Sequence, residues 1–257
     1  MISNFHTHTH RCRHATGTEE EYIARALEGG FRTLGFSDHS PYWFDSDFYS
    51  DFRMFREQLP DYAATVLALK EKYAGTIEIR LGLETEYYPR LFPELLRHLR
   101  DYPFDYLLLG QHYVDHEVNQ CYLGAMRTAD PNFLETYCNQ VIDAMYTGSF
   151  SCFAHPDIFG FTGDEKIYRK QMGRVCRAAK QCGIPLEINF LGLRTGRHYP
   201  DERLLTVAAE EGNKVIFGSD AHTAKDVWDP ETEERALGLV KTYGLELVSD
   251  FQMRGIG

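Results

Sequence analysis

The chain has 257 residues, of which 43% are apolar and 25% charged, and its formal net charge at pH 7 is −11. This composition is ordinary for a globular protein, and a length near 250 residues fits one large barrel, so we expect residues 1–257 to form a single domain. The sequence has no cluster of five or more Lys and Arg residues, which argues against a nucleic-acid partner, because such binding depends on neutralising phosphates.

Apolar stretches, the N-terminal segment and the cysteines indicate where the protein is expected to reside. No apolar stretch approaches the roughly 20 residues that span a bilayer, and the N-terminus lacks the basic and apolar regions of a signal peptide. The cysteines form no C-x-x-C pair, and we interpret them as free thiols in a reducing compartment, with Cys12 as an accessible loop thiol. The sequence therefore predicts a cytoplasmic protein without a membrane partner. The six cysteines are Cys12, Cys121, Cys138, Cys152, Cys176 and Cys182.

Along the chain, short apolar runs alternate with helical patterns. Short continuous apolar runs bounded by turn signals are typical of buried parallel strands. The predicted strands are Ile2–Phe5, Thr33–Phe36, Ile77–Leu81, Tyr106–Leu109, Cys152–Ala154, Pro185–Ile188 and Lys214–Phe217.

The segments between these runs have the apolar spacing of amphipathic helices. Strands that alternate with helices indicate an α/β fold with a parallel sheet. Seven such units, without a Gly-x-Gly-x-x-Gly fingerprint after the first strand, favour a closed or nearly closed barrel over a doubly wound nucleotide-binding fold. The predicted helices are Glu19–Glu28, Phe52–Tyr73, Pro89–Leu99, Phe133–Tyr146, Lys166–Gln181, Glu202–Glu211 and Glu231–Tyr243.

Every predicted strand ends beside a polar side chain that can bind a metal ion or form hydrogen bonds. One such residue means little, but core packing does not explain seven. In α/β barrels the C-terminal ends of the strands carry the active site, so we expect these side chains to share one site. In strand order they are His6 and His8; Asp38 and His39; Glu84 and Glu86; His112; His155; Asn189; and Asp220 and His222.

Two of these segments have the spacing of metal ligands. His6 and His8 form an H-x-H at a strand end, and Asp220 and His222 form a D-x-H at another. Alternate residues of an extended chain point to the same side, so each pair can reach one ion. Mixed imidazole and carboxylate ligands suit zinc, manganese or iron better than calcium, which prefers oxygen ligands alone.

The combined pattern resembles the PHP superfamily, named for polymerase and histidinol phosphatase. The motifs that carry the resemblance are His6-Thr-His8, Ser37-Asp38-His39, His155, and Gly218-Ser219-Asp220-Ala221-His222. Within this superfamily the chain looks most like the monofunctional histidinol-phosphate phosphatases, through Arg11-Cys12-Arg13-His14, Gly82-Leu83-Glu84, Glu187-Ile188-Asn189 and Gly192-Leu193-Arg194.

The resemblance implies a distorted (β/α)7 TIM-like barrel with a site for two or three divalent metal ions at the C-terminal ends of its strands. It also implies how nine ligands are shared between the ions. The first ion would take His6, His8, Glu84 and Asp220; the second His14, His39 and His222; and the third His112 and His155, with Glu84 bridging.

Further residues are candidates for substrate binding and proton transfer. A phosphate monoester carries two negative charges, and Arg194 and Arg197 follow the sixth strand, where either guanidinium suits bidentate phosphate binding. We place Arg194 slightly ahead of Arg197. Asn189 and His198 are expected to contact substrate. Asp220 and His222 are alternative proton donors to the leaving alkoxide, and Asp38 either transfers a proton or orients a ligand.

The leading interpretation is hydrolysis of L-histidinol phosphate, a small phosphate ester, to L-histidinol and phosphate in histidine biosynthesis. The acidic chain suits a substrate with cationic groups. One alternative is a PHP-type phosphoesterase that acts on nucleotides or short oligonucleotides. A remote alternative is a non-catalytic metal-binding domain, which the complete set of nine candidate ligands disfavours.

Overall fold

The computed structural model describes residues 1–44, 46–118 and 122–256. Its centre is a sheet in which all neighbouring strands run parallel, in the order β1-β2-β3-β4-β6-β8-β9-β10. The seven predicted strands are confirmed as β1 to β4, β6, β8 and β9, and β10 adds an eighth at one edge. The strands are β1 (Ser3–Asn4), β2 (Thr33–His39), β3 (Glu78–Thr85), β4 (Tyr106–Leu109), β6 (Cys152–Phe153), β8 (Leu186–Asn189), β9 (Lys214–Gly218) and β10 (Glu246–Leu247).

The sheet curls until its first strand meets the segment that follows β9. Thr7 and Ala221 form a parallel bridge, and the backbone N–H of His8 donates to the carbonyl oxygen of Ala221 at 3.0 Å. These contacts bring the residues after β1 beside those after β9, at the C-terminal ends of both strands. The expected distorted TIM-like barrel is therefore confirmed.

The interior of the barrel is filled by a small cluster of buried side chains, namely Phe5, Tyr106, Leu108, Cys152, Ala154 and Ile216. Tyr106 is fully buried, and its hydroxyl donates to the carbonyl oxygen of Phe5 at 2.7 Å. The ring occupies space left by Gly82, where a Cβ would overlap it. Phe251, near the C-terminus, packs on Phe5 with ring centroids 4.5 Å apart and covers the N-terminal end of the barrel.

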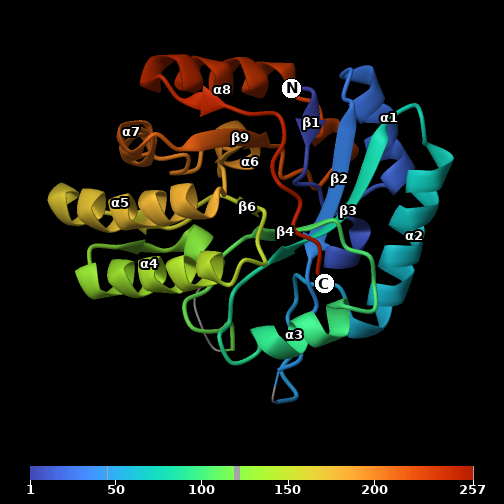
Figure 1. The fold of residues 1–257 in the computed structure, drawn as a ribbon, viewed down its shortest axis with the longest axis horizontal. Helices are drawn as coiled ribbons and strands as arrows, with labels where there is room; N and C mark the ends of the chain where they lie inside the picture. The colour runs from blue at the N-terminus through green and yellow to red at the C-terminus, as the bar shows by residue number, and fades with distance from the viewer. Residues whose placement is uncertain (45, 119–121, 257) are drawn as a thin grey trace.

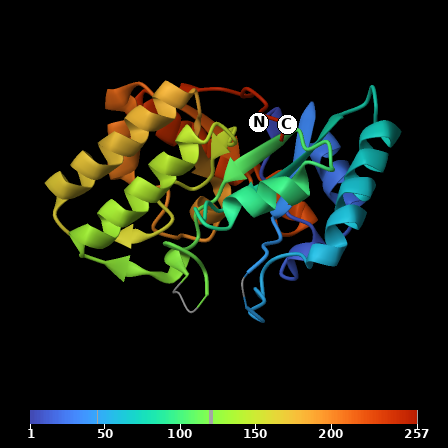
Figure 2. The ribbon, with the colours of Figure 1, turned by 60° about the horizontal axis from the view of Figure 1, so that its bottom comes forward.

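Helices cover the outside of the sheet (Figure 1). Helices α1 and α2 pack beside β2 and β3, whereas α4 and α5 form a pair on the other side of the molecule, visible in both views (Figure 2). The helices are α1 (Glu19–Glu28), α2 (Leu59–Lys72), α3 (Phe92–Leu99), α4 (Pro131–Tyr146), α5 (Glu165–Cys182), α6 (Phe190–Arg194), α7 (Glu202–Glu211) and α8 (Pro230–Tyr243).

Helix boundaries follow local sequence signals. Thr18 forms a capping box with Glu21 at the start of α1, and Asp164 accepts two backbone N–H groups at the start of α5. These side chains satisfy donors that the first helical turn leaves free. Gly183 ends α5 with φ of 65°, a left-handed conformation that glycine adopts without steric cost.

Two predicted helices begin later than expected, and the prediction of a helix from Phe52 was wrong. Helix α2 starts at Leu59, after a short 3-10 turn at Arg56–Gln58, because Phe52 and its neighbours lie along a pocket wall. Helix α3 starts at Phe92, after a turn. The short helix α6 and a small two-stranded sheet, β5 (Arg127–Thr128) with β7 (Gly160–Phe161), had no counterpart in the sequence prediction.

The structure also bears on the predictions about membrane and thiols. Within the three described stretches of the chain, every helix is too short or too polar to cross a membrane. Five cysteines are described and all five are free thiols, whereas Cys121 lies outside the described residues.

Candidate metal centre and active site

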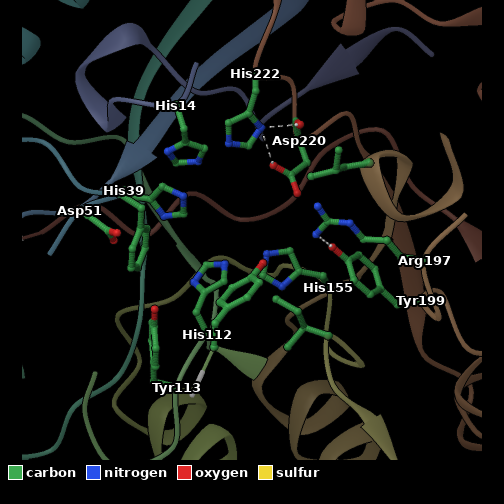
Figure 3. A pocket seen from close by; sticks show the side chains of 14 residues that line it. His14, His39, Asp51, His112, Tyr113, His155, Arg197, Tyr199, Asp220 and His222 are labelled. Atoms are coloured by element: carbon green, nitrogen blue, oxygen red, sulfur yellow. Dashed lines mark hydrogen bonds and ion pairs between the residues drawn. The ribbon is translucent and has the colours of Figure 1, made fainter. Parts of the chain in front are cut away.

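The nine candidate ligands lie together at the C-terminal end of the barrel. Those that also line the cavity are labelled in Figure 3: His14, His39, His112, His155, Asp220 and His222. Several groups of three have ligand atoms within 4.8 Å of one another. These groups include His6, His8 and Glu84; His14, His39 and His222; His39, Glu84 and His112; and His6, His155 and Asp220.

Glu84, at the end of β3, is the centre of this arrangement. Its Oε2 lies 3.4 Å from Nε2 of His6 and 3.1 Å from Nδ1 of His39. Its Oε1 lies 2.8 Å from Nε2 of His155 and 3.4 Å from Nε2 of His112. The carboxylate has this position because the residue beneath it is Gly110, where a Cβ would overlap the Glu84 side chain.

The D-x-H and H-x-H segments face each other across the closure of the barrel. Nε2 of His8 lies 3.2 Å from Oδ1 of Asp220. The rings of His8 and His222 stack with centroids 4.1 Å apart, and the rings of His14 and His222 are 4.5 Å apart. Candidate ligands from the two ends of the barrel closure thus lie close enough to bind the same or neighbouring metal ions.

Unpaired polar atoms test whether these residues fit metal ions. Buried polar atoms in proteins almost always have hydrogen-bond partners. Some buried atoms without a partner are scattered over the described residues, such as Nε of Arg25 and the hydroxyl of Tyr168, but the candidate ligands hold a concentrated group of them. The atoms of this group are Nε2 of His6, both ring nitrogens of His8, Nδ1 of His39, Oε2 of Glu84, Nδ1 of His155 and Nε2 of His222. Bound divalent cations would satisfy these lone pairs, so the residues fit the group that the sequence implied.

The pKa shifts of the candidate ligands also bear on metal binding. Burial raises the pKa of Glu84 and of Asp220, but the surrounding histidines outweigh it and hold both well below their usual range. Burial and the charge of His8 lower the pKa of His222 to about 3. The site therefore presents ionised carboxylates beside a neutral His222 imidazole. Burial lowers the pKa of His6, His8 and His155, but the carboxylates outweigh it and raise all three, so a metal ion must displace protons from these rings.

Two of the candidate ligands have an unusual backbone conformation. His155 has φ of 29° and Asp220 has φ of 47°, in the left-handed region that residues other than glycine rarely adopt. Such conformations cost free energy and concentrate at functional sites. At both positions the turn directs a side chain from a strand end toward the other ligands.

Acceptors behind the ligands fix the orientation of three rings. Nδ1 of His6 lies 2.8 Å from Oε2 of Glu187, and Nδ1 of His112 lies 2.7 Å from Oε1 of Glu86. A histidine that donates one N–H to a carboxylate offers its other nitrogen to a metal ion. Nδ1 of His14 lies 2.8 Å from the carbonyl oxygen of Cys12, whereas Asp38 lies behind His8 but 3.6 Å from its Nδ1, beyond hydrogen-bond distance.

From the sequence, Glu86 was predicted only as a polar residue at a strand end, and Glu187 only as part of a motif. Each follows the same signal that marks the ligands, namely a polar residue at or beside the end of a buried strand. Glu187 lies two residues before Asn189, on the same side of β8, and could have been found from that alternation.

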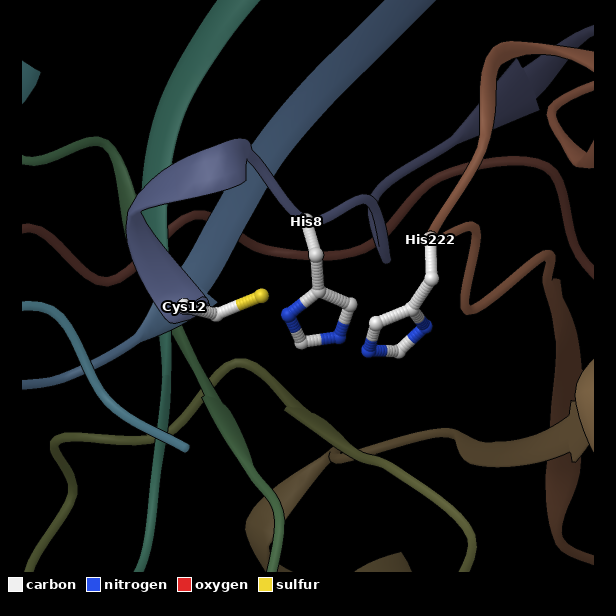
Figure 4. Close-up of side chains that lie close together, drawn as sticks. All are labelled: His8, Cys12 and His222. Atoms are coloured by element: carbon white, nitrogen blue, oxygen red, sulfur yellow. The ribbon is translucent and has the colours of Figure 1, made fainter. Parts of the chain in front are cut away.

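Cys12 was expected to be an accessible loop thiol, and that prediction was wrong. Its side chain is fully buried, with its sulfur close to His8 and His222 (Figure 4). Burial and the charge of Asp38 raise the pKa of the Cys12 thiol. The thiol lies within reach of two candidate ligands, in a group of three that could itself hold a metal ion.

A cavity of about 550 Å³ opens over the candidate ligands. Arg197 lies on one side of it, beside Tyr199, whose hydroxyl accepts a hydrogen bond from the guanidinium at 2.9 Å. Asp51 lies on the opposite side, next to Phe52 (Figure 3). The described lining is completed by His14, His39, His112, Tyr113, Tyr122, His155, Ile158, Leu191, Asp220 and His222.

The remaining predicted substrate residues lie elsewhere. Nε of Arg194 lies 3.4 Å from Oδ1 of Asp226, so its guanidinium is engaged outside the cavity lining, and the preference for it over Arg197 finds no support. Asn189 is buried, caps α6 and donates to Oδ2 of Asp220 at 3.0 Å. Nε2 of His198 bonds to the carbonyl oxygen of Ile158 at 2.7 Å. Asn189 and His198 thus lie outside the described cavity lining.

Comparison with known proteins agrees with this geometry. The sequence model of the PHP domain matches residues 4–190. The chain belongs to the PHP family. It is 32% identical to a probable histidinol-phosphatase of Deinococcus radiodurans over 245 residues, which cover 88% of each chain. It is 25% identical to the histidinol-phosphatase of Bacillus subtilis over 86% of this chain and 94% of the relative.

Solved structures show the same PHP fold. The histidinol phosphate phosphatase of Lactococcus lactis, complexed with zinc, L-histidinol and phosphate, superposes with a TM-score of 0.74 at 22% identity, over 98% of this chain and 97% of that chain. The putative histidinol phosphatase of Listeria monocytogenes gives a TM-score of 0.73 at 19% identity, over 90% and 99%. The family and fold expected from the sequence are confirmed.

Proposed function

We propose that this protein is a metal-dependent phosphatase that hydrolyses L-histidinol phosphate to L-histidinol and phosphate. The observation that carries the proposal is the cluster of unpaired buried ligand atoms on the floor of a cavity that also exposes a guanidinium. The curated relatives named as histidinol-phosphatases support the substrate, since the D. radiodurans protein matches over most of both chains.

The metal centre holds two or three divalent ions, with zinc, manganese and iron as the candidates that suit its ligands. We assign His6, His8, Glu84 and Asp220 to the first ion, His14, His39 and His222 to the second, and His112 and His155 to the third, with Glu84 shared. Divalent ions in such a site lower the pKa of water and neutralise the oxygens of a phosphoryl group.

Arg197 binds the phosphoryl group. It is the arginine of the described cavity lining, and Tyr199 orients it through the hydrogen bond to its guanidinium. A planar guanidinium can donate two parallel hydrogen bonds to phosphate, which also neutralises charge as the ester bond breaks.

The other side of the cavity suits the leaving group. L-Histidinol carries an amine and an imidazole, both of which can be positively charged. Asp51 supplies a carboxylate there, and Phe52 and Tyr113, whose rings stack on each other, supply aromatic surface against which a flat ring can stack. The cavity thus places an arginine at one end and a carboxylate at the other, as an anionic phosphate with a cationic leaving group requires.

His222 serves this reaction as a ligand rather than as the proton donor to the alkoxide. A pKa of about 3 leaves its imidazole neutral near pH 7, so it has a lone pair to offer and no spare proton. Asp220, whose pKa is lowered, is likewise ionised and accepts hydrogen bonds from Asn189. Asp38 is buried behind His8 and accepts hydrogen bonds from the Thr9 hydroxyl and the backbone N–H of His39, so we assign it to holding these segments rather than to proton transfer.

The test is phosphate release by the metal-loaded protein from L-histidinol phosphate, beside sugar phosphates, nucleotides and short oligonucleotides. The proposal predicts that L-histidinol phosphate leads in kcat/KM by several orders of magnitude. A nucleotide or oligonucleotide as the best substrate would favour the other phosphoesterase hypothesis and contradict the assignment of Asp51 to a cationic leaving group.

A further inference from the structure

A buried arginine lies behind the candidate ligands, between the loops that follow β2, β3 and β4. Arg53 is only 1% exposed. Its NH1 lies 2.7 Å from Oε2 of Glu86 and donates to the carbonyl oxygen of Ser40 at 3.1 Å. Its Nε and NH2 donate to Oε2 of Glu117 at 2.9 and 2.5 Å. One guanidinium thus contacts two buried carboxylates from different loops.

A buried cluster of charged side chains contributes little net stability to a fold. Removing two carboxylates and a guanidinium from water costs free energy that their attraction repays only with good geometry, and apolar residues of similar size often do as well. The arrangement therefore calls for a role beyond packing. Glu86 indicates that role, because its other oxygen reaches the metal centre.

Glu86 connects Arg53 to a candidate ligand. Oε2 of Glu86 pairs with the guanidinium, while Oε1 lies 2.7 Å from Nδ1 of His112. A proton on Nδ1 then leaves Nε2 of His112 free, and this nitrogen points toward Glu84, 3.4 Å from its Oε1. With both oxygens engaged, the Glu86 carboxylate holds one orientation, and the His112 ring holds one tautomer.

Arg53 also holds its own segment against the histidines. Its guanidinium carbon lies 4.5 Å from the centre of the Phe52 ring, which packs edge-on against His39 with centroids 4.9 Å apart. From the outer side, Arg13 donates to the backbone carbonyl oxygens of Arg53, at 3.2 Å, and of Ser50. The segment that lines the cavity is therefore fixed from two sides.

We propose that Arg53 is a positioning residue of the metal centre: it fixes Glu86, which orients His112, and it holds Phe52 against the histidine cluster. The inference rests on the proposed function in one respect, that His112 is a metal ligand. Arg53 acts through Glu86 and touches neither substrate nor metal.

The experiment is a chelator titration of the metal-loaded, full-length protein, with metal release measured in the absence of substrate. In Arg53→Met we expect the affinity for the most weakly held ion to fall about 10- to 100-fold, the usual effect of losing a group that supports a metal ligand. Glu86→Gln should have a similar effect. The double variant should lose little more than either single variant, because both changes act on one path to His112.

A conservative variant and a matched control separate positioning from folding. Arg53→Lys keeps the positive charge but lacks the planar guanidinium that contacts two carboxylates. We therefore expect its metal affinity to lie between those of Arg53→Met and the parent protein. Arg254→Met removes a guanidinium that donates to the carbonyl oxygen of Phe150 at 2.6 Å, just before β6 and away from the cavity lining. That control should lower the unfolding midpoint and leave the metal affinities unchanged.

The inference is overturned if Arg53→Met loses stability as Arg254→Met does but keeps the metal affinities of the parent protein. If Arg53→Met does not fold, unchanged affinities in both Arg53→Lys and Glu86→Gln overturn it equally. Because the titration uses no substrate, a correct result for Arg53 stands even if another ester proves to be the substrate. A parent protein that binds no divalent ion would contradict the proposed function itself.

Discussion

Nδ1 of His6 lies 2.8 Å from Oε2 of Glu187, although one residue follows the first strand of the sheet and the other lies in β8. The second oxygen of Glu187 accepts a hydrogen bond at 2.6 Å from Asn189, which also donates to Asp220. Two candidate ligands of the same ion therefore share one supporting carboxylate. The metal centre depends on this layer as well as on the ligands themselves.

Replacing Glu187 tests that dependence. In Glu187→Gln the carboxylate charge that holds the N–H of His6 is lost, and we expect metal affinity to fall about 10- to 100-fold. Chelator competition measures it. Glu210→Gln, which changes an exposed carboxylate paired with Arg169, is the matched control and should bind metal as the parent protein does. Equal affinity in both variants would contradict the supporting role of Glu187.

The two arginines after β8 should differ in their effect on catalysis. Arg197 lines the cavity, whereas Arg194 pairs with Asp226. Hydrogen bonds to charged groups contribute about 1.5 to 3 kcal/mol, so Arg197→Met should lower kcat/KM roughly 10- to 100-fold. Steady-state kinetics with L-histidinol phosphate measures the loss. A larger loss in Arg194→Met than in Arg197→Met would reverse the assignment.

Metal affinity should rise with pH. Burial lowers the pKa of His8, but the neighbouring carboxylates of Asp220, Asp38 and Glu84 outweigh it and raise this pKa to about 9. Below that pH the metal-free His8 holds a proton that an ion must displace, so affinity is lost as pH falls from about 9. One displaced proton corresponds to about a tenfold change in affinity per pH unit.

Chelator competition at about pH 6.5 and about pH 8.5, combined with measurement of proton release, checks this dependence. His222, whose pKa is about 3, is already neutral across that range and contributes no proton. An affinity that is the same at both pH values, with no proton released, would contradict the protonation states given for the cluster.

Tyr106, in the barrel interior, should affect the free energy of unfolding but not catalysis. Tyr106→Phe removes the hydroxyl that donates to the buried carbonyl oxygen of Phe5, and a buried acceptor without a partner costs about 1 to 3 kcal/mol. Urea unfolding measures the free energy, and kcat/KM should not change. Tyr146→Phe, at a tyrosine that is 58% exposed, should change stability by less than about 0.5 kcal/mol. Equal stabilities would contradict the role of Tyr106.

Sequence periodicity predicted the helices that bury one apolar face and the strands whose whole apolar run is buried. The boundaries of α1, α7 and β4 agree to the residue, because capping and turn residues mark their ends. The start of α2 was missed because Phe52, an apolar residue before the helix, packs on His39 in the cavity wall instead of on the barrel. Pattern alone cannot distinguish an apolar residue that faces the core from one that faces a pocket.

The site residues differ in how far the sequence alone could predict them. The candidate ligands could be predicted because strand ends of a parallel barrel converge, whatever the loops do. The choice between Arg194 and Arg197 could not, since it depends on the turns of α6 and on Asp226, which lies far along the chain. Arg53 and Glu117 gave no signal, because charged loop residues are normally exposed and their burial arises only from three loops packing together.

The central claim is that divalent ions held by these nine side chains carry out the hydrolysis. The most direct test is to strip the protein with a chelator and assay phosphate release from L-histidinol phosphate while zinc or manganese is added back. The account predicts no activity in the stripped protein and recovery that saturates at two or three ions per chain. Full activity in the verified metal-free protein would contradict it.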